Sequence, residues 1–433
     1  MLPPMTRDLR AANANSRREL LKVVIATSLV TCLELFDFTV FSYFAVMIGD
    51  QFFPATDPMT SLLLAVGTFG VGFFMRPLGA MVIGAYADRV GRRAAMTITI
   101  WLTAAGTAAI AVCPPFAAIG VAAPCIILVG RLLQGFAAGG EVGAAVTFAM
   151  EAGPPSQRGI LVSWQYASQA AAALFGALLG TLLTSTMSPA SLTQWGWRIP
   201  FLIGLLIVPA GLYLRRQLVD SPARGASGRS TSLPIVELCR EHGGTLVLAT
   251  LTKIWSTVPV YAVITFMPSY VTRVLHMPAI IGFLSSTLST LLLVVVSPLS
   301  GLLADRLPRR KPLVLITSGA TALLAYPVFA MMAHAKGPLT VLFGTAVISV
   351  LLALGTSIGA LLVLEAFPAR VRASGFAISH ALGVTLFGGT AQFIITGLIK
   401  WTGDPVSAAW YVAPACLVSF LAVLAFKERR AVA

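Results

Sequence analysis

The stretch Gly84-Ala-Tyr-Ala-Asp-Arg-Val-Gly-Arg-Arg93 is a dense cluster of charge between two long apolar runs. A second copy stands at Gly301-Leu-Leu-Ala-Asp-Arg-Leu-Pro-Arg-Arg310, so the glycine, the Asp-Arg pair and the Arg-Arg pair recur 217 residues later. Another pair of related stretches begins at Glu151 and at Glu365, 214 residues apart. Two different motifs that repeat at nearly the same distance predict a chain built from two similar halves.

The composition indicates that these halves lie in a membrane. Hydrophobic residues make up 57% of the chain and charged residues 11%, whereas soluble domains carry about 25% charged residues. A helix that crosses a bilayer needs ~20 apolar residues. Twelve such runs are present: 21–48, 60–86, 94–113, 121–149, 159–186, 198–215, 245–272, 279–303, 312–333, 339–365, 373–399 and 407–426. We therefore predict an all-α membrane protein with twelve transmembrane helices in two six-helix bundles.

The same runs predict the domain organisation. The expected parts are a cytoplasmic tail (1–20), a first six-helix bundle (21–215), a cytoplasmic linker rich in Ser, Gly and Arg (216–244), a second bundle (245–426) and a short cytoplasmic tail (427–433). The first 20 residues are polar and basic without a small-residue cleavage pattern, so no removed signal peptide is expected. The last seven residues leave no room for a signalling domain, which argues against a nutrient sensor.

The basic residues predict the orientation. With both termini in the cytoplasm, 23 of the 30 Lys and Arg residues fall on that side, and only Arg198, Arg273, Lys336 and Lys400 fall at the opposite ends. This asymmetry is the positive-inside rule. It also accounts for the net charge of +14, so we expect contact with anionic lipid and no nucleic acid as a partner.

Several charged side chains interrupt the apolar runs of the first half. Glu34 and Asp37 lie one helical turn apart, and an ionised carboxylate in mid-membrane costs at least ~3 kcal/mol, which favours a functional role over simple pairing with a neighbouring helix. Arg131, Gln134 and Glu141 share one face of their helix at 100° per residue. Arg76 also lies deep in its run, where a structural partner and a substrate role are equally open.

Polar side chains in later runs extend this set. Gln165 lies in an intramembrane polar stripe at the start of the fifth run. Lys253 lies about two turns from the cytoplasmic end of the seventh run, so snorkelling to the membrane surface and substrate binding are both open. Tyr261 lies further along the same helix, where Pro259 and Pro268 predict bends.

Motifs for other kinds of chemistry are missing from the sequence. There is no phosphate loop, no His-Glu-x-x-His and no Gly-x-Ser-x-Gly, which argues against an ATP-driven pump, a membrane hydrolase or any other enzyme. The five cysteines have no metal spacing and indicate no disulfide framework. We expect no cofactor and no bound metal.

Longer strings resemble a known family. The Gly84–Arg93 stretch with its echo, and Gly130-Arg-Leu-Leu-Gln-Gly135, resemble signatures of the major facilitator superfamily. Glu34-Leu-Phe-Asp-Phe38, Phe74-Met-Arg-Pro-Leu-Gly-Ala80 and Trp195-Gly-Trp-Arg-Ile-Pro-Phe201 resemble its metabolite:proton symporter branch, and look closest to the citrate-proton symporter and tricarballylate transporter members. The resemblance covers essentially the whole chain.

The resemblance implies a transport mechanism and a location. Substrate would bind at mid-membrane between the bundles and gain access by rocking of one bundle against the other. The two charged loops would form a cytoplasmic gate, with these residues: Asp88, Arg89, Arg92, Asp305 and Arg306. The protein would act as a monomer in the bacterial cytoplasmic (inner) membrane, with protons, a small organic anion and the lipid bilayer as its partners.

Side-chain chemistry then assigns the roles. The planar guanidinium of arginine matches a carboxylate, so Arg131 is the first candidate for binding substrate, followed by Lys253 and Arg76, with Gln134, Gln165 and Tyr261 as polar neighbours. The candidates for carrying the coupling proton are Glu34, Asp37 and Glu141.

These roles predict proton-coupled uptake of an organic anion, best matched by a tricarboxylate such as citrate or tricarballylate. Three alternatives remain for the substrate: a dicarboxylate, for which α-ketoglutarate is the example; shikimate; and a betaine. An exporter is disfavoured because Gly176 to Gly180 lacks the Gly-x-x-x-Gly-Pro pattern expected of exporters.

Overall fold

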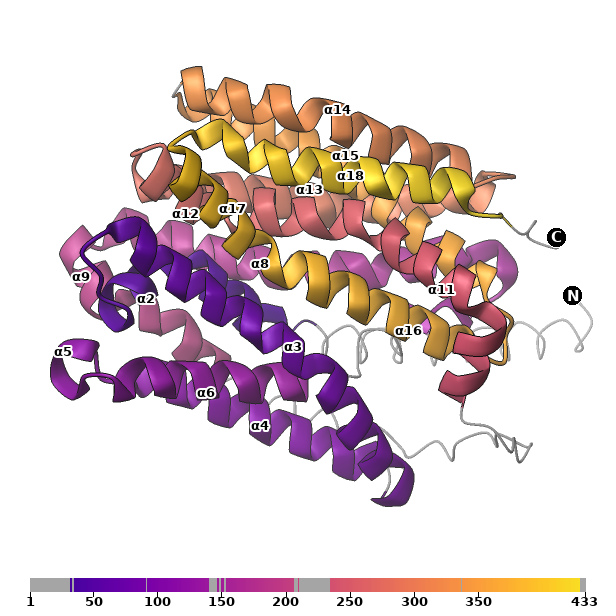
Figure 1. Cartoon of the computed structure of the whole chain (residues 1–433), viewed down its shortest axis with the longest axis horizontal. Coiled ribbons are helices and arrows are strands. Elements are labelled where there is room, and N and C mark those ends of the chain that lie inside the picture. Colours follow the sequence, from indigo (N-terminus) through magenta and orange to yellow (C-terminus); the bar gives the residue numbers. More distant parts are fainter. Residues whose placement is uncertain are drawn as a thin grey trace, which may run out of the picture.

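The computed structural model of the chain describes residues 32, 35–90, 92–139, 146–147, 149–151, 153–205, 209, 234–335 and 337–428. Every regular element in these residues is helical, and the long helices lie roughly side by side along the longest axis of the molecule (Figure 1). The all-α prediction is therefore confirmed.

The first half, up to the gap after residue 209, opens with helical residues 35–43. Its named elements are α2 (Ala45–Phe52), α3 (Pro58–Val90), α4 (Arg92–Val112), α5 (Phe116–Ile119), α6 (Ala122–Ala137), η1 (Pro155–Gln157), α8 (Arg158–Thr186), α9 (Pro189–Gln194) and η2 (Gly196–Arg198), and helical residues 199–205 follow.

The second half has the same order of long helices. Its elements are α11 (Pro234–Pro259), η3 (Val260–Thr265), α12 (Met267–Ser269), η4 (Tyr270–Val274), α13 (Ala279–Arg306), α14 (Lys311–Ala335), α15 (Pro338–Ala366), α16 (Arg372–Gly383), η5 (Val384–Gly388), α17 (Gly389–Thr402), η6 (Pro405–Ala408) and α18 (Ala409–Ala425).

The helices have the length and composition needed to cross a bilayer. Eight spans in the described residues are long and apolar enough, and the shorter apolar helices Thr97–Val112 and Ala122–Ala137 lie beside them. Helical residues 35–52 and 199–205 belong to the first and sixth predicted runs. All twelve predicted runs therefore contain helix.

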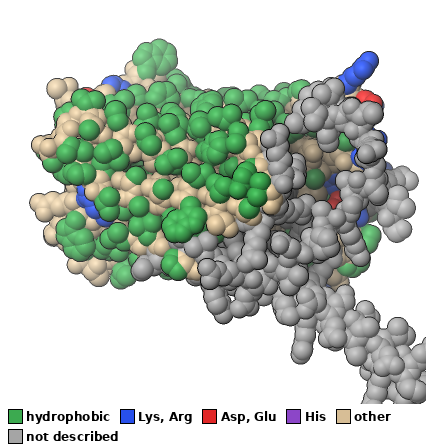
Figure 2. Space-filling view, turned by 90° about the horizontal axis from the view of Figure 1, so that it is seen from below, with side chains coloured by type: hydrophobic (Ala, Val, Ile, Leu, Met, Phe, Trp, Pro, Cys, Tyr) green, Lys and Arg blue, Asp and Glu red, His purple; other side chains and the backbone are tan. Residues whose placement is uncertain are grey.

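The surface between the two ends of the molecule is apolar. Hydrophobic side chains cover much of the described part of the face shown in Figure 2, and charged side chains lie toward its ends. Large apolar residues stand exposed on several helices, among them Met81, Ile316, Leu323 and Phe343. Exposed apolar surface on this scale is expected where lipid is the solvent.

The ends need names that do not depend on orientation. We call the end with α5 and α9, on the left in Figure 1, the Asp57 end, and the opposite end the Arg310 end.

Small residues bring α3 and α6 into backbone contact. A Cβ atom on Gly135 would collide with the Gly72 carbonyl, and one on Gly79 would collide with the Phe136 carbonyl. Glycine at these positions allows the helices to approach closely, as is common in membranes. The contact fixes α6, and hence Arg131, against α3.

One predicted helix is shorter than expected. The sequence predicted a continuous helix over 121–149, but α6 ends at Ala137 and residues 138–139 form a turn, before helical residues at 146–147. Gly139 packs against α3, where a Cβ atom would meet the Arg76 carbonyl. Glycine is a poor helix former and favours helix ends, which the apolar count alone did not reveal.

Two helices of the second half change their winding. Helix α11 ends at Pro259 and continues as the π-helical turn η3, and α16 continues as the π-helical turn η5 before α17. Proline lacks the N–H that would continue the α-helical ladder, so the predicted irregularity at Pro259 has a direct cause. The turn η5 contains no proline and was not predicted. π-Helical turns frequently mark functional sites.

The halves also meet directly along α8 and α13. Near the Arg310 end, a Cβ atom on Gly301 would collide with the Ser163 side chain; toward the Asp57 end, one on Gly180 would collide with the Phe283 ring. Close packing at both places holds the two halves together along most of the length of these helices.

Candidate substrate and proton site

Arg131 is fully buried in the first half, next to its boundary with the second half. Its side chain is 0% exposed, and its Nη1 donates to Gln134 Oε1 at 2.8 Å. The guanidinium carbon lies 4.2 Å from the centre of the Phe38 ring and 4.6 Å from that of Phe41, which are cation–π distances. Its Nε and Nη2 have no hydrogen-bond partner among the described residues. Two donors of a buried cation thus remain available for an anion.

A chain of hydrogen bonds joins Arg131 to a buried carboxyl group. Gln134, which accepts from Arg131, donates through Nε2 to Thr107 Oγ1 at 2.9 Å. The Thr107 hydroxyl in turn donates to Asp37 Oδ2. Asp37 is 4% exposed, and its Oδ1 has no partner in the described part of the chain. We call these four residues the polar chain.

A second guanidinium lies beside the first. Arg76 on α3 is buried, with its guanidinium carbon 4.6 Å from the centre of the Phe38 ring and 4.2 Å from that of Phe73. The Tyr261 ring, from the other half, lies 5.4 Å from the Phe73 ring and within electrostatic range of Arg76 and Arg131. Aromatic rings therefore hold both cations in place at the boundary between the halves.

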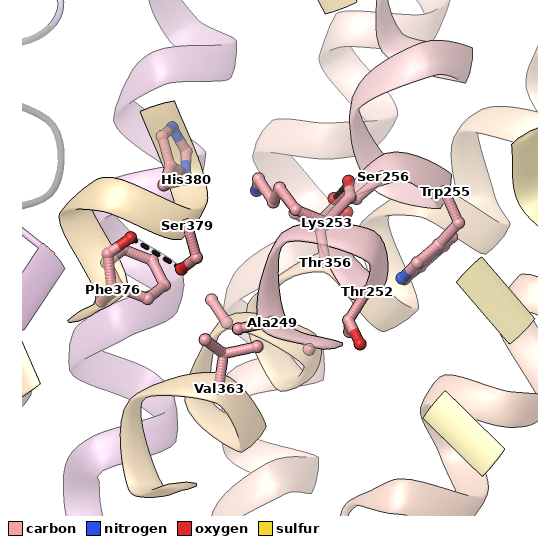
Figure 3. A pocket seen from close by; sticks show the side chains of 12 residues that line it. Ala249, Thr252, Lys253, Trp255, Ser256, Thr356, Val363, Phe376, Ser379 and His380 are labelled. Atoms are coloured by element: carbon pink, nitrogen blue, oxygen red, sulfur yellow. Dashed lines mark hydrogen bonds between the residues drawn. The ribbon is translucent and has the colours of Figure 1, made fainter. Parts of the chain in front are cut away.

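Lys253 makes a further contact across this boundary. It lies in the apolar span Arg240–Thr265, and its Nζ donates to the Tyr166 hydroxyl of α8 at 3.4 Å. Lys253 also lines a cavity with His380 and Thr252, formed by α11, α15 and α16 (Figure 3). The cavity volume is about 10 Å³, which is room for roughly one water molecule.

The sequence analysis missed a polar network nearer the Asp57 end. Gln392 Nε2 donates to Ser42 Oγ at 2.6 Å and to Thr265 Oγ1 at 2.8 Å, so one amide ties the first half to two helices of the second. Ser42 donates to the Thr265 carbonyl at 3.1 Å. Serine and threonine are common in these helices, so no sequence signal distinguished Ser42 and Thr265. Thr107 was not predicted as a site residue for the same reason.

The structure brings together many of the predicted site residues. Arg131, Gln134 and Asp37 are connected, and Arg76 and Tyr261 lie beside them. Lys253 borders the neighbouring cavity, and Gln165 is buried on α8. Glu34 and Glu141 lie outside the described residues.

Contacts join the two halves at the Arg310 end. Asp305 accepts hydrogen bonds from the backbone N–H groups of Gly159 at 2.6 Å and Ile160 at 3.0 Å, in the first turn of α8. A carboxylate is stabilised there by the helix dipole. Arg372 pairs with Glu151 at 3.4 Å.

The other predicted gate residues are less informative. Arg306 is exposed; Asp88 and Arg89 lie in the last turn of α3 and Arg92 begins α4, but their side chains lie outside the described part. Their part in a gate remains a prediction.

Replacing Asp305 with alanine is expected to loosen the Arg310 end. The variant loses two charge-assisted hydrogen bonds to the other half, each worth ~1.5–3 kcal/mol before relaxation. Distances between spin labels on α8 and α13 should shift toward longer values at this end. Asp404→Ala is the matched control, because Asp404 caps η6 within one half. An unchanged distance distribution for Asp305→Ala would remove Asp305 from the gate.

Contacts join the halves at the Asp57 end as well. Arg273 pairs with Asp50, and Lys400 Nζ lies 3.1 Å from Asp57 Oδ2, so both pairs join the two halves. Hydrogen bonds from Thr60 and from Lys400 lower the pKa of Asp57 from its usual 3.8 to about 2. The stabilisation is complete above the usual pKa and is lost only as the pH falls through the lowered value.

This charge pair should therefore not sense the protons that drive transport. Asp57→Asn is expected to change the uptake rate by the same factor at every pH from 5 to 8, because Asp57 stays ionised throughout that range. Initial uptake rates measured across this range test the expectation. A changed pH optimum in Asp57→Asn would contradict it.

Comparison with known proteins agrees with this architecture. Residues 27–382 match the family model described as "Major Facilitator Superfamily". The chain is 37% identical to a citrate-proton symporter of Klebsiella pneumoniae, over 93% of this chain and 90% of that protein. It is 31% identical to the alpha-ketoglutarate permease of Escherichia coli K12, over 97% and 96%, and 31% identical to a proline/betaine transporter of Salmonella typhimurium, over 95% and 84%.

Solved structures give the same picture of the fold. The structure is similar to that of the E. coli xylose transporter XylE in a partially occluded inward open conformation, with a TM-score of 0.77, 16% identity and coverage of 94% and 98%. It is also similar to the transporter FucP in the outward conformation, with a TM-score of 0.63, 16% identity and coverage of 94% and 100%.

Proposed function

The chain belongs to the Major Facilitator Superfamily, and from this premise we propose that it is a proton-coupled symporter for uptake of a tricarboxylate such as citrate or tricarballylate. One observation carries the proposal: Arg131 is fully buried with two unused donors, and hydrogen bonds connect it to the carboxyl group of Asp37. The similar proteins are transporters, so the chain is a transporter and not an enzyme.

The geometry suggests how substrate and proton are coupled. A carboxylate that binds the free Nε and Nη2 of Arg131 neutralises the guanidinium by charge-assisted bidentate pairing, which weakens the attraction between Nη1 and Gln134. Gln134 also donates to Thr107, so a shift of this amide alters the hydrogen bond that reaches Asp37. Asp37 takes up the coupling proton, and substrate loading changes the environment of its carboxyl group. Glu34 and Glu141 remain further candidates for that role.

The orientation and the gate belong to the same proposal. The chain is a multi-span membrane protein, and we place it in the bacterial inner membrane with the Arg310 end in the cytoplasm, since Arg306, Arg309, Arg310 and Lys311 cluster there. The bundle boundaries are those given by the sequence, at 21–215 and 245–426. Separation of Asp305 from α8 opens the cytoplasmic side. A single chain contains the whole pathway, so a monomer suffices.

Dicarboxylate transport is the second candidate function. The similarity to an alpha-ketoglutarate permease extends over nearly the whole chain, and two carboxylates suit the same cations. A betaine is less suitable, although a similar protein is a proline/betaine transporter. Its quaternary ammonium would need free aromatic faces, but guanidinium groups already lie over Phe38, Phe41 and Phe73.

Uptake into proteoliposomes tests the proposed function. Radiolabelled citrate should accumulate under an imposed inward proton gradient, and unlabelled tricarballylate should displace it more strongly than succinate, α-ketoglutarate, shikimate or glycine betaine. Gradient-driven uptake of one of the other solutes in place of citrate would retain symport and change the substrate. Citrate uptake whose rate does not depend on the proton gradient would contradict proton coupling.

A further inference from the structure

The cavity in the second half contains polar groups that the polar chain does not use. Helices α11, α15 and α16 enclose it, and Lys253, His380 and Thr252 line it. In Figure 3 the Lys253 side chain extends toward α16, the helix that carries His380. His380 is also within electrostatic range of Arg76. Two basic side chains, Lys253 and His380, therefore border one cavity.

Lys253 lacks a counter-charge. No carboxylate in the described ranges forms an ion pair with it, and its one hydrogen bond to a side chain there is the 3.4 Å contact with the neutral Tyr166 hydroxyl. The Tyr166 ring centre lies 5.1 Å from Nζ, which adds a weak cation–π contact. Removing an ammonium group from water costs several kcal/mol unless it is paired. An anion in the cavity would supply the missing partner.

Other groups around the cavity also lack partners. Nδ1 of His380 and Oγ1 of Thr252 are buried and make no hydrogen bond within the described residues. Thr252 is 2% exposed and lines the cavity wall. Buried polar atoms are normally satisfied, so the imidazole of His380 and the ammonium of Lys253 together indicate a position for an anionic group with several acceptor atoms; the Thr252 hydroxyl points away from both (Figure 3).

We propose that this cavity is a second carboxylate-binding position, and that the transported substrate binds Arg131 in the first half with one carboxylate and Lys253 and His380 in the second half with another. This inference rests on the proposed function and deepens it, because it requires at least two carboxylates in the substrate. The helical segments of Arg76 and His380 are neighbours, because Thr385 of η5, directly after α16, donates to the Phe73 carbonyl of α3 at 3.2 Å.

The dimensions of the cavity give a consequence for binding. Its volume of about 10 Å³ is too small for a carboxylate group, so α16 has to move away from α11 when substrate enters. Gly383 of α16 packs on the Lys253 stem, where a Cβ atom would lie 3.0 Å from the Lys253 Cβ. A substrate that engages both halves draws them together, which makes two carboxylates a requirement for closure as well as for affinity.

A series of acids on one propane skeleton tests the proposal. Tricarballylate, glutarate and butyrate carry three, two and one carboxylates. Titration calorimetry on the purified full chain should show that glutarate and tricarballylate bind much more tightly than butyrate. In Lys253→Met and in His380→Gln the dissociation constants for the two larger acids should rise roughly 10–100-fold, the effect of losing a charge-assisted hydrogen bond. Butyrate binding should stay unchanged, because Arg131 alone holds it.

Matched controls separate this result from misfolding and from failure of the proposed function. His334→Gln changes an exposed histidine on α14 and should bind all three acids as the native chain does. If one variant does not fold, the other still tests the cavity. An unchanged ratio of glutarate to butyrate affinity in either folded variant would overturn the second position alone. If the native chain bound none of the acids, the proposed function would fail with it.

Discussion

Replacing Arg131 with lysine is expected to lower the initial rate of citrate uptake ~100-fold or more. Lysine keeps the charge but lacks the planar fork that matches a carboxylate. The variant also loses the stacking on Phe38 and Phe41 and leaves Gln134 Oε1 without its donor. Loss of one charge-assisted hydrogen bond costs ~1.5–3 kcal/mol, and two such losses account for a factor of this size.

The control for this prediction is an arginine in a similar setting outside the site. Arg198 lies with its guanidinium carbon 4.4 Å from the centre of the Trp197 ring, at the Asp57 end, and donates to backbone carbonyls. Arg198→Lys should retain uptake within a few-fold of the native rate. Native-like uptake by Arg131→Lys would show that the guanidinium does not bind substrate.

Replacing Asp37 with asparagine is expected to abolish accumulation while leaving exchange of substrate. Asparagine has nearly the same shape and still accepts a hydrogen bond from Thr107, but it cannot take up and release a proton. Under an inward proton gradient the ratio of internal to external citrate should therefore fall to about one, a loss of the whole driving force. Exchange of labelled for unlabelled citrate across the same vesicles should continue, because it requires no net proton movement.

Thr107 and Asp57 provide the comparisons for Asp37. Thr107→Val removes the hydroxyl between Gln134 and Asp37 without changing the size of the side chain, and should lower the accumulation ratio; Thr107→Ser should restore it. Asp57→Asn removes a carboxylate at one end and should leave accumulation in place. Full gradient-driven accumulation by Asp37→Asn would show that another group carries the coupling proton. Glu34 and Glu141 are the remaining candidates for that group.

Sequence predicted the helices well because apolar length is a strong local signal. Each of the twelve runs contains helix, and the end of α3 and the start of α4 fall on the charged stretch that revealed the duplication. The end of α6 at Ala137 was missed because hydropathy does not distinguish a continuous apolar helix from one that ends in a turn such as residues 138–139. The π-helical turn η5 was missed because nothing in Val384–Gly388 differs from an ordinary helix.

The site was predicted in part for a similar reason. Arg76, Arg131 and Lys253 stood out because a charge in an apolar run is expensive. The spacing of Arg131 and Gln134 then predicted their shared face, and the structure confirms their contact. Thr107, Ser42 and Gln392 depend on which helices become neighbours, and spacing along one helix contains no such information. His380 was visible as a polar residue, but its proximity to Lys253 required the packing of α11 against α16.

The contacts at both ends have a consequence for the empty carrier. Asp305 of α13 binds α8 at one end, and Arg273 and Lys400 pair with the first half at the other. The chain's own groups make these contacts, so they need no substrate to form. A carrier that can shut while empty can return to the outside without carrying a molecule back. That return step distinguishes a transporter that accumulates solute inside the cell from one that only exchanges one solute molecule for another.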